Sequence, residues 1–474
     1  MCGVVGVWRP EGPVSWAVYA GLLAAQHRGQ ESAGVTVGDG VALRTLRGAG
    51  LVTEVFREGS LEELSGRVGI GHVRYPTAGG DSVAGAQPLV GVTRAGEHFA
   101  LAHNGNVLRI DRGSLNRRGV GYLRTGGPRE REGESDSQVL TDQLAGRDEP
   151  PAQALRELLG RVHGAYCLVL ATRSLLCAAR DPHGFRPLCL GRLPDGGWMV
   201  ASESAVLDAA GADFVRDVEP GELLVIDQDG LRSEHFAAAP PATCLFEHVY
   251  IARPDSLIGG RRVQQVRQAF GALLAARSPV AADVVVPVPD TARPAALGYA
   301  RAAGIDYGEG LVRNHYLGRT FLRPGDGRRR DDVRLKLNPV PEVVRGRRVV
   351  LVDDSLVRAT SMRQAVALLR RAGAAEVHVR IASATISWPC YFGVDISSQE
   401  ELAGHRMSAA EIGAHVGADS LEFLSAEGMR EAVGGEPSLC MGCFTGSYPT
   451  TVPAGAPASA RRVPPPGRTP PPAR

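Results

Sequence analysis

The sequence contains almost no lysine: Lys336 is the single lysine among 53 basic residues. No uninterrupted apolar run approaches the ~18 residues of a membrane-spanning helix, which excludes such a helix. The first residues lack a basic segment followed by an apolar run, so we expect no signal peptide. A net charge of +2 excludes a general nucleic-acid binder. With 44% hydrophobic and 22% charged residues, the composition is typical of a globular cytoplasmic protein.

The sequence contains eight cysteines. In a cytosolic chain of this size, catalytic, metal-binding or buried thiols are the commoner roles. Three cysteines lie within apolar strand patterns, and we expect them in the core: Cys167, Cys177 and Cys189. Cys440 and Cys443 form one metal-type pair, but a zinc ribbon requires a second pair, which is absent.

Two segments with different patterns divide the chain. Residues 2–238 contain short strands and few helices, whereas strand, loop and helix alternate from about residue 278. Apolar strands at 282–288 and 348–352 and a helix at 360–371 indicate a parallel α/β sheet in the second domain, residues 239–448. Residues 449–474 are rich in proline, and we expect a disordered tail. The predicted class is therefore α+β followed by α/β.

The chain begins Met1-Cys2-Gly3. Removal of Met1 before a small residue would give Cys2 both a thiol and a free α-amino group. Because such an amine titrates at about pH 7.7–8.0, it can act as a base at neutral pH. A nucleophile with its own amine as base needs no separate histidine. The alternative is an incidental cysteine near a frayed terminus.

Polar clusters follow several predicted strands, and we expect them at strand ends or turns. Asn104 and Gly105 offer an amide side chain and a backbone N–H, which are suitable donors to an oxyanion. Arg74 and Asp136 can bind the carboxylate and the ammonium group of an amino acid. The alternative is turn chemistry, because Asn-Gly favours hairpins and Asp caps helices.

Taken together, these segments resemble the class II glutamine amidotransferase domain, which is an N-terminal-nucleophile hydrolase. The matching segments are residues 2–6, 26–34, 71–77 and 102–106. The resemblance implies an αββα sandwich with Cys2 as nucleophile and Asn104 and Gly105 as the oxyanion hole. It also implies glutamine binding by Arg74, Thr77 and Asp136.

In the second domain, a buried strand ends in Asp353-Asp354-Ser355. Adjacent carboxylates can accept hydrogen bonds from a ribose diol. The loop 355–361 enters a helix, whose N-terminal N–H groups favour phosphate. The alternative is a strand whose final aspartates only cap the next helix.

This domain resembles the type I phosphoribosyltransferases and, in longer segments, the amidophosphoribosyltransferase family. These segments are residues 247–256, 287–299, 318–321 and 333–339. The resemblance implies that ammonia from glutamine attacks C1 of phosphoribosyl pyrophosphate (PRPP), forming 5-phosphoribosylamine for purine synthesis. The implied contacts to PRPP and Mg²⁺ come from Asp290, Thr291, Asp353, Asp354, Ser355, Thr360, Ser361 and Lys336. Lys336 falls in a segment, 319–336, that resembles a loop closing over PRPP.

The family resemblance also extends to a cofactor and to partners. Some members hold a [4Fe–4S] cluster on four cysteines, which match Cys244, Cys390, Cys440 and Cys443. Buried free thiols and structural zinc are the alternatives. Family members are tetramers, so we expect a homo-oligomer, with purine nucleotides as feedback inhibitors.

Two departures from the family pattern concern the PRPP site. Ala292 and Ala359 stand where the family usually has glycine. If either position has a positive φ, alanine costs about 1 kcal/mol or more. Two alternatives therefore stay open: an enzyme of the same build in a specialised pathway, and a PRPP- or nucleotide-binding regulator with a weakened transferase site.

Overall fold

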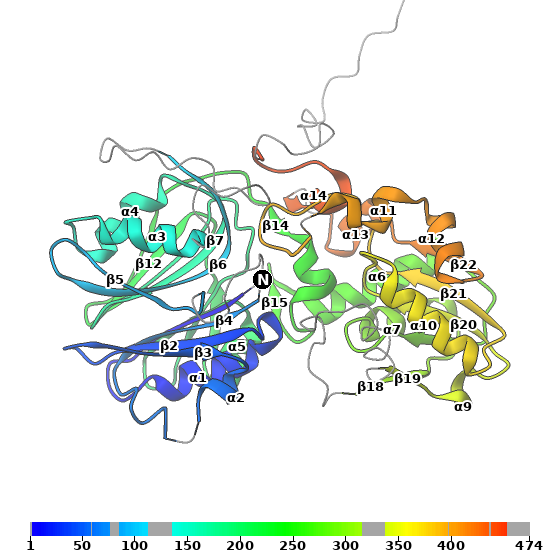
Figure 1. Cartoon of the computed structure of the whole chain (residues 1–474), viewed down its shortest axis with the longest axis horizontal. Helices are drawn as coiled ribbons and strands as arrows, with labels where there is room; N and C mark the ends of the chain where they lie inside the picture. Colours follow the sequence, from blue (N-terminus) through cyan, green and yellow to red (C-terminus); the bar gives the residue numbers. More distant parts are fainter. Residues whose placement is uncertain are drawn as a thin grey trace, which may run out of the picture.

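The structure is a computed structural model that describes residues 2–57, 59–75, 85–111, 135–314, 337–396, 398–435 and 438–452. Its two halves lie side by side, and the chain begins close to their junction (Figure 1). None of the helices in these ranges is long and apolar enough to span a membrane. The predicted loop 319–336 and residues 453–474 of the predicted tail lie outside the described residues.

Two antiparallel sheets form the N-terminal half. Within the described residues, the first sheet has the strand order β11 (Asp213–Asp217), β9 (Cys189–Arg192), β10 (Trp198–Ala201), β1 (Gly3–Trp8), β4 (Val68–Arg74), β2 (Ser32–Gly38) and β3 (Leu43–Ala49). The second has the order β13 (Gly230–His235), β12 (Glu222–Asp227), β8 (Leu176–Arg180), β7 (Val162–Ala171), β6 (His98–Ile110) and β5 (Leu89–Val92).

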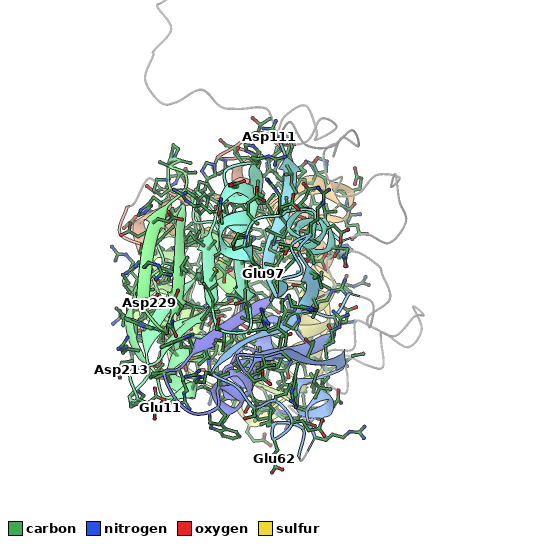
Figure 2. The ribbon with its side chains drawn as sticks, turned by 90° about the vertical axis from the view of Figure 1, so that its left-hand side faces the viewer. Glu11, Glu62, Glu97, Asp111, Asp213 and Asp229 are labelled. Atoms are coloured by element: carbon green, nitrogen blue, oxygen red, sulfur yellow. The ribbon has the colours of Figure 1, made fainter. Side chains whose placement is uncertain are left out.

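Helices cover the outer face of each sheet. Helices α1 (Ser15–Ala24), α2 (Val52–Val55) and α5 (Ser204–Ala210) pack on the first sheet. Helices α3 (Asp136–Ala145) and α4 (Pro151–Leu159) pack on the second. Figure 2 shows the stacked sheets from the side, with Glu62 and Asp229 projecting at the periphery.

Alternation along β1 explains this layering. Val5 and Val7 point into the core beneath the helices, whereas Val4 points into the core between the sheets. The predicted core cysteines are buried in these layers: Cys189 under the helices of the first sheet, Cys177 under those of the second, and Cys167 between the sheets. The αββα sandwich is confirmed.

The C-terminal half contains a parallel sheet with the order β17 (Val284–Pro287), β20 (Arg348–Asp353), β21 (Glu376–Ile381) and β22 (Ser420–Phe423). Helices α6 (Val263–Arg277), α7 (Arg293–Ala303) and α13 (Ala426–Ala432) cover one face, while α10 (Thr360–Arg371) and α12 (Ala409–Val416) cover the other. Val350 and Val352 point to the first face and Val349 and Leu351 to the second. Burial on both faces explains why these strands are continuously apolar.

Short elements complete this half. They are β14 (Thr243–Cys244), a π-helical turn (Glu247–Ile251), β15 (Leu257–Ile258), β16 (Arg261–Arg262), β18 (Leu311–Arg313), β19 (Leu337–Pro339), α9 (Pro341–Val344), a 3-10 helix (Gln399–Glu401), α11 (Ala403–Arg406), β23 (Leu439–Cys440) and α14 (Gly442–Thr445). The domain boundary at residues 238 and 239 stays a prediction. The last strand of the paired sheets, β13, ends at His235.

Candidate active sites

Cys2 lies directly before β1, beside the strand β6 that carries Asn104 and Gly105. The backbone nitrogen of Cys2, which becomes the α-amino group once Met1 is removed, donates to Asn104 Oδ1 at 3.1 Å. Asn104 Nδ2 is buried and has no hydrogen-bond partner in the described ranges. A buried donor without a partner is costly, so this amide is suited to receive an oxygen of a bound substrate.

The alternative that Asn104 and Gly105 only form a hairpin turn is wrong. Both lie inside β6, where Gly105 pairs with Tyr166 of β7. The φ angle of Gly105 is 152°, and a Cβ there would lie 2.0 Å from the carbonyl oxygen of Ala165. Glycine is therefore required by the close approach of β7 rather than by a hairpin.

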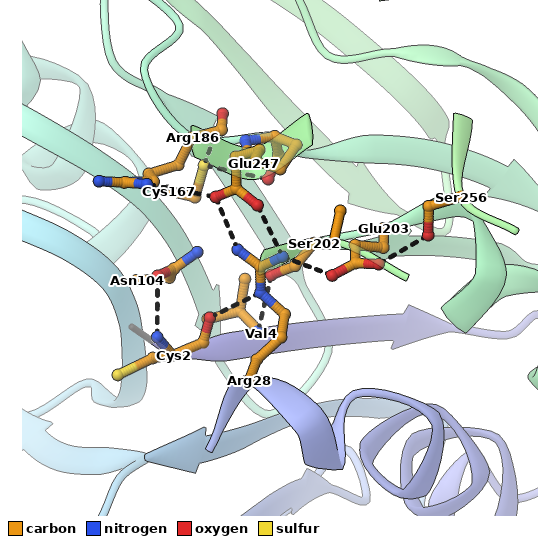
Figure 3. Close-up of polar contacts among 12 residues, drawn as sticks. Cys2, Val4, Arg28, Asn104, Cys167, Arg186, Ser202, Glu203, Glu247 and Ser256 are labelled. Atoms are coloured by element: carbon orange, nitrogen blue, oxygen red, sulfur yellow. Dashed lines mark hydrogen bonds and ion pairs between the residues drawn. The ribbon is translucent and has the colours of Figure 1, made fainter. Parts of the chain in front are cut away.

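A network of buried arginine and glutamate side chains, which the sequence did not indicate, contacts the backbone of Cys2 (Figure 3). Arg28 Nε donates to the carbonyl oxygen of Cys2 at 3.0 Å. Its guanidinium also contacts Glu203 and donates to Glu247 Oε1 at 2.9 Å, and Glu247 Oε1 accepts from Arg186 Nη1 at 3.2 Å. All four charged side chains are fully buried. Because Glu247 belongs to the C-terminal half, the network ties the position of Cys2 to that half.

Burial alone would raise the pKa of Glu203. His27 and Arg28 outweigh it and hold the pKa of this carboxyl well below its usual range. Removing one member of such a network leaves its partner charged, buried and unpaired, which costs about 3–5 kcal/mol.

Of the predicted glutamine ligands, Arg74 lies beside Cys2 and Asp136 lies against β6. Gly3 is opposite Val73 in the β1–β4 pair, so Cys2 comes next to Arg74 at the end of β4. Arg74 Nη1 is buried without a hydrogen-bond partner in the described residues. Asp136 begins α3 and accepts from the backbone N–H of Val107 at 3.1 Å.

Electrostatics keep Asp136 ionised. Burial alone would raise its pKa, but the nearby His103 outweighs burial and lowers it. Burial alone would lower the pKa of His103, but the Asp136 carboxylate outweighs burial and raises it. Asp136 is thus a carboxylate available to an ammonium group. Thr77, the third predicted glutamine ligand, lies outside the described residues, as does Lys336.

The second predicted site lies at the carboxyl ends of β17 and β20. Val285 also makes a parallel bridge to Tyr307, on the opposite side of β17 from β20. The direction of winding therefore reverses between β17 and β20, and ligands of parallel sheets bind at such points. Asp290 follows β17, and Asp353 ends β20.

The two carboxylates at the end of β20 are adjacent, with Asp353 half-buried and Asp354 buried. Burial raises the pKa of Asp354 to about 6. Burial and the neighbouring Asp354 raise that of Asp353 well above its usual value. Ser355 Oγ donates to Asp354 Oδ1 at 2.6 Å. These groups need a ligand that donates hydrogen bonds or carries positive charge.

The other residues predicted to bind PRPP follow β17 or begin α10. Asp290 Oδ1 accepts from Arg293 Nη1 at 2.8 Å, and its other oxygen lies 3.4 Å from Arg313 Nη1. Thr291 follows Asp290 in the loop after β17. Thr360 and Ser361 are exposed at the N-terminus of α10, which has no side-chain cap. The helix can therefore offer N–H groups to an anion.

The two alanines differ in backbone conformation. Ala292 has φ −81°, which any residue adopts without strain. Ala359 has φ 61° and is the one non-glycine residue with positive φ in the part of the chain that the structure describes. Alanine is strained there by about 1–2 kcal/mol. The departure at Ala359 is therefore costly and that at Ala292 is not.

Four cysteines converge next to the junction of the halves. Cys244 is opposite Cys440 in the parallel pair of β14 and β23. Burial raises the pKa of Cys443 well above its usual value, and the nearby Cys390, Cys244 and Cys440 raise it further. Burial likewise raises the pKa of Cys244 to about 11, although Arg186 opposes the rise. Thiols gathered and buried in this way fit a cofactor that binds several thiolates.

In the described ranges, no three His, Cys, Asp or Glu side chains are close enough to hold a single metal ion. A zinc ion needs all of its sulfur ligands at about 2.3 Å, so the four cysteines do not fit one. An iron–sulfur cluster differs in that the four thiolates bind several irons rather than one.

Comparisons with known proteins bear on both halves. The glutamine amidotransferase domain family matches residues 72–209. An amidophosphoribosyltransferase of Mycobacterium tuberculosis is 46% identical over 461 residues, which are 95% of this chain and 87% of that protein. One of Archaeoglobus fulgidus is 44% identical and covers 96% of this chain and 99% of that one. The chain belongs to the amidophosphoribosyltransferase family, whose members are enzymes.

A solved structure agrees with this assignment across both halves. Glutamine PRPP amidotransferase from B. subtilis, complexed with ADP and GMP, superposes with a TM-score of 0.85 at 39% identity. It covers 97% of this chain and 100% of its own. The solved relative thus matches this chain over both halves.

Proposed function

We propose that this chain makes 5-phosphoribosylamine from PRPP, glutamine and water, releasing glutamate and pyrophosphate, as the first committed step of purine biosynthesis. The observation that carries the proposal is the presence of both sites in one chain of this family: Cys2 against Asn104, and two aspartates at the end of β20. A regulator would have no need of the first site.

In the first stage, the thiolate of Cys2 attacks the side-chain amide of glutamine. The α-amino group takes the thiol proton and later delivers it to the departing ammonia. The free Nδ2 of Asn104 and the backbone N–H of Gly105 hold the oxyanion. Arg74 binds the carboxylate of glutamine, with Thr77 beside it in sequence, and Asp136 binds the ammonium group. Water then hydrolyses the γ-glutamyl thioester.

In the second stage, ammonia attacks C1 of PRPP and pyrophosphate leaves. Asp353 and Asp354 accept hydrogen bonds from the ribose diol, and Ser355, Thr360 and Ser361 hold the 5′-phosphate at the start of α10. Asp290 and Thr291 face the pyrophosphate, with Arg293 and Arg313 adjacent. Lys336 contacts an anion of PRPP. A hard cation suits oxygen ligands of this kind, and Mg²⁺ would neutralise charge on the leaving pyrophosphate.

The four-cysteine group, Cys244, Cys390, Cys440 and Cys443, holds a [4Fe–4S] cluster in this proposal. The support is their convergence and the burial of Cys244, Cys440 and Cys443. Anaerobically purified protein should contain about four iron and four sulfide per chain. Cys443→Ala should lose both, whereas Cys177→Ala, a buried thiol outside the group, should keep them. Iron-free wild-type protein would refute the assignment.

The solved B. subtilis relative is complexed with ADP and GMP. We infer that purine nucleotides inhibit this chain as feedback regulators. We also infer that the chain forms a homotetramer and works in the cytoplasm. Sedimentation of the full chain tests the homotetramer directly.

Cys2→Ala separates the two stages. The variant should lose glutamine-dependent synthesis and retain synthesis from ammonium salts, because the PRPP site does not use the thiol. Loss of both activities in a folded variant would contradict the two-site scheme. Asn104→Ala is the companion variant, expected to lower glutamine turnover about 10²–10³-fold with ammonia-dependent synthesis intact.

A further inference from the structure

The segment after Cys390 crosses the junction and lies against the strand that carries the oxyanion hole. A Cβ on Gly393 would lie 3.0 Å from the carbonyl carbon and 3.1 Å from the carbonyl oxygen of Gly105. The backbones of these two glycines are therefore in direct contact. Since Gly393 also has φ 100°, only glycine fits this place without strain.

The two residues before Gly393 are fixed to the N-terminal half by side chains. Asn106 Nδ2 donates to the carbonyl oxygen of Tyr391 at 2.7 Å. Arg186 Nε donates to the carbonyl oxygen of Phe392 at 3.0 Å. The ring of Phe392 stacks on Phe185 with a centroid distance of 4.2 Å.

A small hydrophobic core continues this contact. It contains Leu108 of β6 and Ala165 of β7, packed together with Tyr391, Phe392 and Tyr448 of the C-terminal half. Three consecutive residues, 391–393, thus each meet the N-terminal half. Two of these contacts are with Asn106 and Gly105, which follow Asn104 in β6. The Nδ2 of Asn104 has no hydrogen-bond partner in the described residues.

We propose that residues 391–393 form the back wall of the oxyanion hole, with Asn106 and Gly393 as positioning residues that set the backbone of Gly105. This inference rests on the proposed glutaminase reaction. Neither residue touches the substrate; both act through Gly105. The oxyanion hole is thereby completed by the second half of the chain.

The geometry explains why such support matters. The Gly105 N–H must meet an oxygen that carries charge only during reaction, and a misplacement of ~1 Å costs about 10²-fold in rate. The φ of 152° departs from ordinary strand geometry at Gly105, and the β6–β7 register shifts two residues later, between Val107 and Arg109. Contact with Gly393 and the hydrogen bond from Asn106 fix it there.

The test compares Gly393→Ala with Gly417→Ala in the full-length protein. Gly417 also has positive φ, 77°, but a Cβ there meets nothing within 4 Å. Both variants place a Cβ on a residue with positive φ, and only the first adds a methyl against Gly105. Asn106→Ala removes the donor to Tyr391 without adding charge.

We expect Gly393→Ala and Asn106→Ala to lower the kcat of glutamine hydrolysis by about 10- to 100-fold with little change in the KM for glutamine. Ammonia-dependent synthesis should be unchanged in both. Gly417→Ala should keep the wild-type kcat. Equal kcat in Gly393→Ala and Gly417→Ala, beside an active wild-type protein, would overturn the inference.

Binding of the γ-aldehyde analogue of glutamine supplies a readout that misfolding alone does not mimic. The thiol of Cys2 adds to this aldehyde, and the resulting oxygen occupies the oxyanion hole. Its affinity should fall by the same factor as kcat, while the affinity for glutamate stays constant. A parallel fall in both affinities would assign the residues a merely structural role. A wild-type chain that hydrolyses no glutamine would instead refute the proposed function.

Discussion

The two alanines of the PRPP site provide a matched pair for measuring backbone strain. Ala292 and Ala359 are both buried, 0% and 4% exposed, and both begin a helix after a strand. They differ in φ, which is −81° in the first and 61° in the second. Replacing each with glycine therefore changes the same atoms in two different conformations.

Three contributions determine the free energy of unfolding. Each substitution removes a buried methyl, worth about 0.8 kcal/mol, and each adds freedom to the unfolded chain, worth about 0.4–1 kcal/mol. Only Ala359→Gly also releases left-handed strain of about 1–2 kcal/mol. We expect Ala292→Gly to destabilise by about 1.5 kcal/mol and Ala359→Gly to be nearly neutral.

Thermal unfolding of the ligand-free protein measures this contrast. For domains of this size, 1 kcal/mol corresponds to about 2–4 °C, so Ala292→Gly should lower Tm by about 3–6 °C and Ala359→Gly by no more than about 2 °C. Ala359 belongs to the buried apolar cluster that also contains Leu356 and Met362, so the KM for PRPP should not change. Equal Tm losses would refute the strain, and a large fall in KM would show that the methyl obstructs phosphate.

Three further outcomes are expected. Arg74→Ala should raise the KM for glutamine by at least ten-fold, because a charged hydrogen bond is worth about 1.5–3 kcal/mol; unchanged KM would contradict its role. Glu247→Gln should leave two buried arginines short of charge, destabilise the chain by about 3–5 kcal/mol and slow glutamine turnover; a Tm equal to wild type would contradict the network. Burial lowers the pKa of His248 to about 4. Between pH 6.5 and 4 the unfolded chain therefore binds a proton that the folded chain does not, and the free energy of unfolding decreases as the pH is lowered. Replacement of His248 by Gln should reduce the slope of unfolding free energy against pH by about 1.4 kcal/mol per unit; an unaltered slope would show that His248 is not the group.

Local patterns predicted the regular elements well where one pattern dominates. The predicted helix 360–371 has the observed bounds of α10, Thr360–Arg371, because its apolar spacing matches one helical face. The apolar run 282–288 contains β17. By contrast, Asn104-Gly105 suggested a turn, and pairing with β7 overrode that local preference.

The residues proposed to act on a ligand carry a motif signal in the sequence, whereas the residues that support them do not. Cys2 and Asn104 were predicted and lie in contact. Glu247 lay in a matching segment, but nothing in the sequence links it to Arg28, which is 219 positions away. The sequence likewise gives no sign of the role of Gly393, because its contact with Gly105 exists only after both halves have folded. Such tertiary partners carry no periodicity or spacing signal.

The central claim is that one chain couples glutamine hydrolysis to PRPP consumption. The most direct measurement is the simultaneous release of glutamate and pyrophosphate by anaerobically purified protein with glutamine, PRPP and Mg²⁺. The account predicts equal amounts of both products, each dependent on the presence of PRPP. Glutamate release without pyrophosphate release would contradict it.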